Sequence, residues 1–174
     1  KGELILMDFG AEYANYASDL TRTVPVSGSF SPRQKEVYQA VLRVMKAATQ
    51  LLVVGNVLDS YHKKVGVLME KELIKLGLLK ATDVKKQDPL QPLYKRYFMH
   101  GTSHFMGLDV HDVGTRRETF KSGMVFTCEP GIYIKEENLG IRIENDYLIT
   151  ENGPIDLMAN IPIEVDEIEA LMNV

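Results

Sequence analysis

Three of the four histidines in this chain fall within the stretch His100-Gly101-Thr102-Ser103-His104-Phe105-Met106-Gly107-Leu108-Asp109-Val110-His111-Asp112. Histidine is the commonest metal ligand in proteins and the usual acid–base residue near neutral pH. The grouping is compatible with chance, or with one metal ligand flanked by two catalytic residues. Carboxylates elsewhere in the chain that converge on the stretch would favour the second interpretation.

The overall composition is ordinary for a soluble globular protein. The chain has 174 residues, enough for one domain with a substantial core, and 45% of them are hydrophobic. A net charge of −4, with no block rich in Lys or Arg, argues against nucleic-acid binding. No apolar run reaches the roughly 18 residues that a membrane span needs, so no membrane partner is expected. Cys128 is the single cysteine, which excludes an internal disulfide and leads us to expect a cytoplasmic protein.

Hydrophobic patterning predicts an α+β domain made of a β-hairpin, two helices and then mainly antiparallel strands. Residues 4–9 are apolar on both faces, which indicates a buried strand, and residues 16–26 would pair with it as a hairpin. Residues 123–134 are typical of strand–turn–strand, with the turn around Glu129-Pro130-Gly131, and residues 140–150 are typical of a further strand. A short closing helix is expected over residues 162–172.

Two amphipathic helices are expected after the hairpin. Ser31 and Gln34 form a capping box, from which apolar residues recur at helical spacing until Gly55. The second helix is expected over residues 59–76 and carries His62, which lies far from the other histidines in sequence. We expect His62 to be a structural residue.

Four carboxylates lie in strand-like apolar segments, namely Asp8, Asp19, Glu129 and Glu144. A buried carboxylate is costly unless it is paired or bound to a metal. For Asp8 the alternative is a strand-end position that faces water. Arg142 shares a strand face with Glu144 at a spacing of two, so it could orient that carboxylate behind a metal or form a structural ion pair.

One histidine and four carboxylates can share an apolar site if cations neutralise them. Two divalent metals would supply the positive charge that four carboxylates require, and oxygen-rich ligands with one imidazole favour manganese-like ions. Two metals bridged by carboxylates and a water are a recognised hydrolytic device. The chain has no compact ligand motif such as HExxH, so from spacing alone a structural interpretation of these residues stays open.

Separated motifs along nearly the whole chain resemble, in the same order, those of the pita-bread (M24-type) metallopeptidases. Among these, the closest resemblance is to the aminopeptidase P (Xaa-Pro aminopeptidase) family. The motifs are Met7-Asp8-Phe9-Gly10, Tyr16-Ala17-Ser18-Asp19-Leu20-Thr21-Arg22-Thr23, His100-Gly101-Thr102-Ser103-His104, Cys128-Glu129-Pro130-Gly131 and Gly140-Ile141-Arg142-Ile143-Glu144-Asn145-Asp146.

The resemblance implies a pita-bread fold that is incomplete here. Residues 1–174 would form a single domain, the C-terminal part of a catalytic domain. The N-terminal domain and the start of the catalytic domain, with a further cleft histidine, would be absent. The sequence opens on Lys1 rather than on methionine, which fits an excised piece. We therefore expect the isolated chain to bind metal poorly and to be inactive.

The resemblance also implies a dinuclear metal site, with two divalent ions that would be manganese, or alternatively cobalt or zinc. Asp8 would chelate one metal, while Asp19 and Glu144 would bridge both. His104 and Glu129 would complete the coordination of the other.

The activity that the resemblance implies is hydrolysis of the bond between the first residue of a peptide and a following proline, by a hydroxide that bridges the two metals. Glu129 would carry the proton from the water to the leaving nitrogen. His111 would donate to the substrate carbonyl or the developing oxyanion, and His100 would position the substrate. The alternative for both histidines is a structural role in the substrate cleft. The partners would be a peptide with proline second and, for the full-length parent, further copies of itself.

Three other functions remain open. Xaa-Pro dipeptidase (prolidase) shares the fold and the ligands, although Ser103 favours aminopeptidase P. Methionine aminopeptidase is less favoured, because residues 108–112 resemble the proline-peptidase version of this segment. A metal-free homologue could serve as a peptide-binding module, but such relatives usually lack ligands, and all five ligand positions are filled here.

Overall fold

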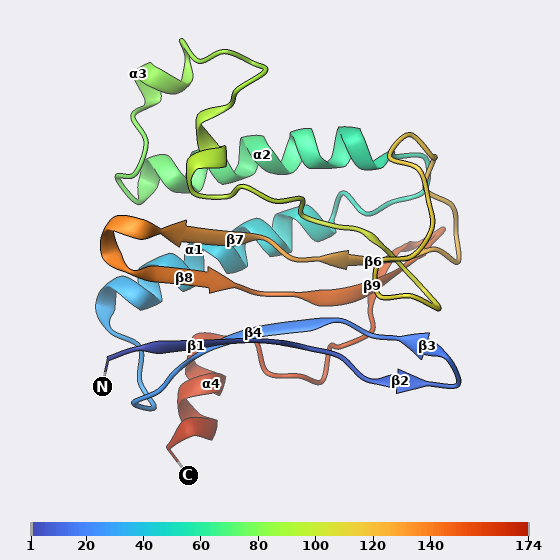
Figure 1. Cartoon of the computed structure of the whole chain (residues 1–174), viewed down its shortest axis with the longest axis horizontal. Coiled ribbons are helices and arrows are strands. Elements are labelled where there is room, and N and C mark those ends of the chain that lie inside the picture. The colour runs from blue at the N-terminus through green and yellow to red at the C-terminus, as the bar shows by residue number, and fades with distance from the viewer. Residues whose placement is uncertain (1, 174) are drawn as a thin grey trace.

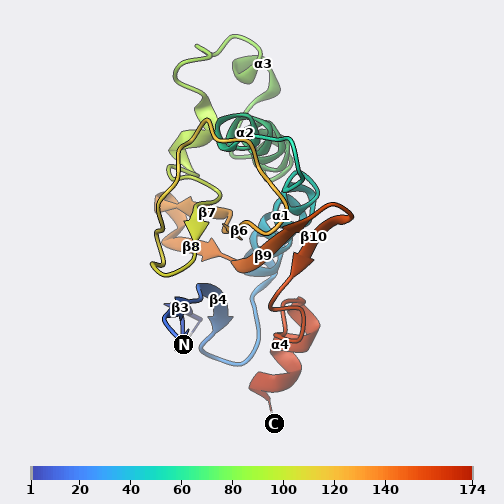
Figure 2. The same ribbon diagram turned by 90° about the vertical axis from the view of Figure 1, so that its right-hand side faces the viewer.

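A long interrupted ribbon of antiparallel strands is covered by two helices and flanked by a separate hairpin in the computed structural model, which describes residues 2–173 (Figures 1 and 2). The helices are α1 (Pro32–Thr49), α2 (Leu58–Lys75), α3 (Ala81–Val84) and α4 (Val165–Met172), with short 3-10 turns at Leu93–Arg96 and Lys135–Glu137. The strands are β1 (Leu4–Phe9), β2 (Glu12–Tyr13), β3 (Tyr16–Ala17), β4 (Leu20–Pro25), β5 (Phe105–Met106), β6 (Val125–Cys128), β7 (Gly131–Ile134), β8 (Leu139–Arg142), β9 (Asn145–Thr150) and β10 (Gly153–Asp156). The predicted α+β class is confirmed.

The predicted N-terminal hairpin is confirmed, but its first strand is not buried. β1 pairs with β4 in antiparallel register, and β2 and β3 extend the hairpin to its tip. Ile5, Met7 and Phe9 on β1 are 48%, 38% and 53% exposed. The prediction of a buried strand over residues 4–9 is therefore wrong. Among the described residues only β4 pairs with β1, and the face that carries these three side chains has no covering layer.

The ribbon consists of two long strands that are each interrupted at the same level. β6 and β7 lie in line (Figure 1) and pair with β9 and β8, so the predicted turn around Glu129 is wrong. The predicted strand over residues 140–150 is likewise divided, at Ile143-Glu144. Pro130 has no N–H to donate to the ladder. The Glu144 N–H leaves the ribbon and donates to the Thr21 carbonyl oxygen of β4 at 3.1 Å.

Both predicted long helices are present, and their caps explain where they begin and end. The Ser31 capping box is formed in full at the start of α1. α1 ends at Thr49 rather than at Gly55, which lies in a later turn and donates its N–H to the Phe120 carbonyl oxygen. α2 ends one residue before the predicted position, where Gly77 adopts a φ of +76° that a Schellman cap requires.

The C-terminal helix is also present, although α4 is shorter than expected over residues 162–172. Within residues 2–173, no helix combines the length and apolar character that crossing a membrane requires.

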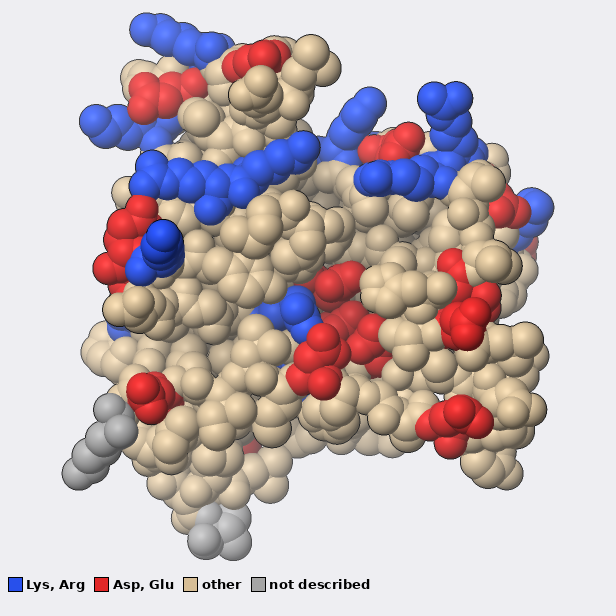
Figure 3. Space-filling view, viewed as in Figure 1, with Lys and Arg blue, Asp and Glu red and all other residues tan. Residues whose placement is uncertain are grey.

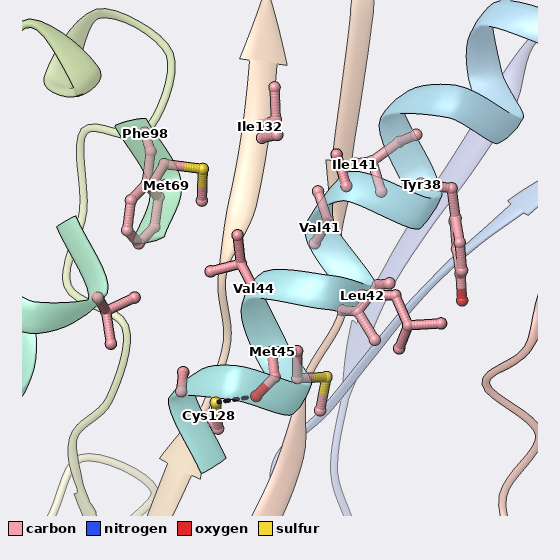
Figure 4. Close-up of a cluster of buried hydrophobic side chains, with 14 of the residues drawn as sticks. Tyr38, Val41, Leu42, Val44, Met45, Met69, Phe98, Cys128, Ile132 and Ile141 are labelled. Carbon is pink, nitrogen blue, oxygen red and sulfur yellow. Dashed lines mark hydrogen bonds between the residues drawn. The ribbon is translucent and has the colours of Figure 1, made fainter. Parts of the chain in front are cut away.

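The hydrophobic core lies between the two long helices and the ribbon (Figure 4). α1 packs on the ribbon, and α2 packs on α1. The fully buried side chains shown include those of Val41, Met45, Met69, Ile132 and Ile141. This core fixes the ribbon, and with it the level at which both strands are interrupted.

The packing of α2 gives a matched test, because two valines on this helix differ in burial. Val65 is fully buried, whereas Val67 is 53% exposed. We expect Val65→Ala to lower the free energy of unfolding by about 2 kcal/mol, since it removes buried methyl groups and leaves a cavity. Val67→Ala should change it by less than about 0.5 kcal/mol. Equal effects in chemical denaturation of the two variants would contradict the packing described.

Candidate metal centre

Acidic side chains gather near the centre of one face of the molecule, with a basic side chain beside them (Figure 3). Three of the sequence-predicted ligands meet closely in this structure. Asp19, His104 and Glu144 each present one ligand atom, and these atoms lie within 4.8 Å of one another. Asp19 directly precedes β4, His104 directly precedes β5, and Glu144 lies at the interruption between β8 and β9. The site therefore joins the hairpin to the ribbon.

Glu144 is fixed by the hairpin strand β4 rather than by the ribbon. Its N–H donates to the Thr21 carbonyl oxygen, and the Thr21 hydroxyl donates to Glu144 Oε2 at 2.5 Å. The Arg22 Nη1 group donates to the Glu144 carbonyl oxygen at 2.7 Å. Glu144 is only 2% exposed. Its carboxylate is thus held in one orientation within the protein interior.

Asp19 is held by its backbone. Its N–H donates to Asp146 Oδ2 at 3.0 Å, and the residue is buried. Because Asp146 belongs to β9, this hydrogen bond is a second link between the hairpin and the ribbon. The side chain of Asp19 remains available to a ligand.

His104 presents one ring nitrogen to the carboxylates. Its Nδ1 lies 2.9 Å from the Phe105 carbonyl oxygen, which can only accept, so Nδ1 carries the proton. The Nε2 lone pair is therefore free, at 3.5 Å from Asp19 Oδ2 and 3.8 Å from Glu129 Oε1. A backbone carbonyl that fixes the tautomer of a histidine in this way is typical of metal-ligating histidines.

Glu129 lies at the interruption between β6 and β7. Its N–H donates to the Thr102 carbonyl oxygen at 2.8 Å, which ties it to the histidine stretch. Its two carboxylate oxygens each lie 3.8 Å from a histidine, Oε1 from His104 Nε2 and Oε2 from His100 Nδ1. The Glu129 carboxylate is therefore adjacent to the cluster formed by the ligand atoms of Asp19, His104 and Glu144.

Asp8 lies at the edge of the site, and its side chain is 52% exposed. The inference of a buried carboxylate at this position is wrong: Asp8 lies near the end of β1, on the face opposite to Ile5, Met7 and Phe9, and is still half exposed there. Arg142 Nη2 donates to Asp8 Oδ2 at 2.5 Å, and Arg142 Nε donates to the Thr21 hydroxyl at 3.0 Å. Arg142 Nε also lies 3.9 Å from Glu144 Oε2. One guanidinium thus positions carboxylates on both sides of the site.

The two remaining histidines of the stretch flank the ligand cluster. Both ring nitrogens of His100 are engaged, because Nδ1 donates to the Gly101 carbonyl oxygen at 2.7 Å and Nε2 accepts from the Tyr133 hydroxyl at 2.9 Å. His111 is exposed and stacks on His104, with ring centroids 3.9 Å apart. His111 is therefore free to contact a ligand, whereas His100 would have to exchange an internal hydrogen bond.

The pKa values of the carboxylates in the site indicate that bound cations would stabilise their ionised forms. Burial, aided by the nearby Glu144, raises the pKa of Glu129 to about 8. Burial likewise raises the pKa of Glu144 to about 7. The pKa of Asp19 is also raised, by burial and then by Asp8. Carboxylates that resist ionisation together, beside an imidazole with a free lone pair, fit a site built for divalent cations.

Several contacts around the site were not predicted from the sequence. His62, expected to be structural, has a half-buried ring whose Nε2 donates to the Ser103 carbonyl oxygen at 3.1 Å. Its Nδ1 accepts from Arg116 Nη2 at 3.2 Å. Thr21 and Tyr133 contact functional candidates through single hydroxyl groups. No periodicity or motif in the sequence marks these contacts, since each joins segments far apart in the chain.

Comparisons with known proteins agree with this site. Residues 1–151 match metallopeptidase family M24. The chain is 44% identical to Xaa-Pro aminopeptidase of Haemophilus influenzae over 99% of its length. Its structure resembles zinc-substituted Escherichia coli aminopeptidase P in complex with product, with a TM-score of 0.89 and 43% identity over 98% of this chain. A variant of the same enzyme in complex with substrate gives a TM-score of 0.90, with 42% identity and 98% of this chain covered.

The match covers nearly all of this chain but only part of its relatives. The chain spans 42% of the Haemophilus influenzae protein and 41% of each Escherichia coli chain. The sequence-based resemblance to the M24-type metallopeptidases, with a partial pita-bread fold, is confirmed by these comparisons. The family match extends from the hairpin to the end of β9 and includes all five predicted ligand positions. The chain belongs to metallopeptidase family M24.

Proposed function

We propose that this chain, as the C-terminal part of a catalytic domain, carries the dinuclear metal centre of an Xaa-Pro aminopeptidase. The observation that carries the proposal is the meeting of Asp19, His104 and Glu144, whose ligand atoms lie within 4.8 Å of one another. Relatives named Xaa-Pro aminopeptidase support the substrate class, a peptide with proline in second position. For the whole protein we also infer a homo-oligomer and a cytoplasmic location. Cys128 of this chain is a buried free thiol, which is compatible with a reducing compartment.

Five side chains would hold two divalent cations, namely those of Asp8, Asp19, His104, Glu129 and Glu144. Their four carboxylates and one imidazole form an oxygen-rich set that favours manganese, with cobalt or zinc as alternatives. When bound, such cations act as Lewis acids that polarise a carbonyl and make water a better nucleophile near neutral pH. Two divalent cations also balance the charge of the four carboxylates.

Glu129 is the proposed proton carrier. Its carboxylate lies at the edge of the closest ligand cluster, beside two histidines, and is largely buried. In this position it would accept a proton from the attacking water and pass it to the proline nitrogen that leaves.

The neighbouring side chains would orient the substrate. His111, exposed and stacked on His104, would donate to the substrate carbonyl as charge develops on its oxygen. His100 would position the peptide by exchanging its hydrogen bond with the Tyr133 hydroxyl. Arg142 would keep Asp8 and Glu144 in place. It donates one hydrogen bond directly to Asp8 and another to the Thr21 hydroxyl, which in turn donates to Glu144.

Peptide hydrolysis tests the proposal, with the polypeptide that carries this chain assayed at its natural length. We expect manganese-dependent release of the first residue from a tripeptide with proline second, at a much higher rate than from the alanine analogue. Glu129→Gln should lower kcat about 10²-fold or more, because the proton carrier is lost. Glu151→Gln, at an exposed position outside the site, should have no effect.

Two results would contradict the proposal. One is equal cleavage of the proline and alanine peptides, and the other is full activity of Glu129→Gln. Faster turnover of an Xaa-Pro dipeptide than of the tripeptide would assign the protein to the dipeptidases instead.

The pKa of Glu129 predicts an unusual pH dependence for the metal-free chain. Its pKa is about 8 in the folded state against 4.5 ordinarily. Between these two pH values the folded state keeps the carboxyl proton, whereas the unfolded state has lost it. The stabilising contribution of this proton is complete below about pH 4.5 and is lost as the pH rises through about 8. Glu129→Gln cannot ionise and should therefore gain stability relative to the wild type between pH 5.5 and pH 8.5, by on the order of 2–4 kcal/mol.

Chemical denaturation in chelator, at both pH values, measures this difference. Glu151→Gln provides the matched control, and its difference from the wild type should not change with pH. Addition of manganese at pH 8.5 should reverse the order, because only the wild type keeps the carboxylate ligand. A difference between wild type and Glu129→Gln that stays constant across this range would show that Glu129 ionises normally.

A further inference from the structure

A second cavity adjoins the metal centre on the side of α2. The cavity over the centre itself has His104, Glu129 and Arg142 in its wall. The second cavity has a volume of about 340 Å³ and is lined by parts of α2, the 3-10 turn at Leu93–Arg96, the histidine stretch and the loop that follows it. The residues that line both cavities are His62, His100, Gly101 and Arg116. A ligand that extends from the metal centre past these residues therefore enters the second cavity.

The second cavity differs from the metal centre in the sign of its charge. Lys63, Lys95 and Arg116 line it, and Asp59 is the one carboxylate in the described part of its wall. Asp59 is already engaged, because Arg116 Nε donates to its Oδ1 at 3.1 Å. Lys and Arg side chains also gather over α2 in Figure 3, apart from the acidic centre. This excess of cations favours an anionic ligand.

Arg116 is oriented by its neighbours and remains open to a ligand. Its Nε binds Asp59 and its Nη2 donates to His62 Nδ1 at 3.2 Å, whereas Nη1 has no hydrogen-bond partner among residues 2–173. The side chain is 69% exposed, so a ligand can reach the guanidinium. His62 donates in turn to the Ser103 carbonyl oxygen of the histidine stretch. A Cβ atom at Gly101 would lie 3.1 Å from the His62 ring, so glycine allows the stretch to pass this close to α2. Arg116 is thereby fixed relative to the metal centre.

The direction of the substrate follows from the role proposed for Glu129. This residue passes a proton to the proline nitrogen, and its Oε2 lies 3.8 Å from Nδ1 of His100, which lines both cavities. The residues after proline therefore extend past His100 toward Arg116. Each residue of extended chain spans roughly 3.5 Å, so the terminal carboxylate of a tripeptide lies roughly 7 Å beyond the scissile carbonyl. The carboxylate of an Xaa-Pro dipeptide reaches about half as far.

We propose that Arg116 binds the terminal carboxylate of a tripeptide substrate, and of the dipeptide released from it, in the second cavity. Arg116 Nη1 donates to the carboxylate, and Lys63 and Lys95 attract it at longer range. An Xaa-Pro dipeptide is too short to make this contact while its peptide bond lies at the metal centre. Arg116 therefore makes the site prefer tripeptides. This inference rests on the proposed function, from which it takes the direction of the substrate.

Hydrolysis of matched peptides by the polypeptide at its natural length tests the proposal. The free acid Ala-Pro-Ala and its C-terminal amide differ only in the carboxylate, so in manganese the KM of the acid should be at least about threefold lower. In Arg116→Gln the ratio of the two KM values should fall to about one, because the carboxylate loses its partner. Arg117→Gln provides the matched control, since it removes a neighbouring exposed cation that does not line the cavity, and it should keep the ratio.

A binding measurement without metal separates this inference from the proposed function. Calorimetric titration of the same polypeptide in chelator, with the dipeptide Pro-Ala and with its amide, should show at least about threefold tighter binding of the acid. Arg116→Gln should bind the two equally, and Arg117→Gln should keep the difference. Lack of proline-dependent hydrolysis together with this difference in binding would reject the proposed function and retain the carboxylate site.

The proposal is overturned if acid and amide have equal KM values or equal affinities on the wild type, or if Arg116→Gln keeps the full preference for the acid. Arg116 lies in an exposed loop, so its substitution leaves the core intact and the comparison of variants stays valid.

Discussion

The hydrogen bonds between Thr21 and Glu144 are the interaction on which the site depends. The Glu144 N–H leaves the ribbon to pair with the Thr21 carbonyl oxygen, and the Thr21 hydroxyl holds the Glu144 carboxylate. This junction divides the long strands at one level and brings the hairpin against them. Asp19 and Glu144 come together there, beside Glu129 and His104 at the neighbouring strand ends. Loss of the junction would separate ligands that the chain supplies from distant segments.

The same junction supports the proposal that the site binds cations. It concentrates carboxylates in a region where burial raises their pKa values, and the Arg142 guanidinium is the positive group that contacts Asp8 and approaches Glu144. One guanidinium cannot balance four carboxylates. Membership of a metallopeptidase family and a likeness to a zinc-substituted relative agree with this requirement. Metal binding and folding should therefore be coupled in this chain.

Local patterns in the sequence predict where helices and strands lie better than they predict which of these elements are exposed. The capping box at Ser31 and the glycine after α2 act within a few residues, so the sequence is sufficient to place them. The motifs also mark the proposed ligand positions, because each motif is local. The open face of β1 and the in-line course of β6 and β7 depend on which segments pair across the chain, and apolar patterning alone cannot show this. The contacts of His62 and Thr21 are hidden for the same reason.

Anomalous diffraction from crystals grown with manganese tests the central claim most directly. The claim is that side chains from five places in the chain hold two divalent cations at the junction of hairpin and ribbon. We predict two anomalous peaks, one beside His104 Nε2 and Glu129 and the other beside Asp8, with Asp19 and Glu144 contacting both. Absence of a peak among these side chains at saturating manganese, or a peak only elsewhere on the chain, would contradict the account.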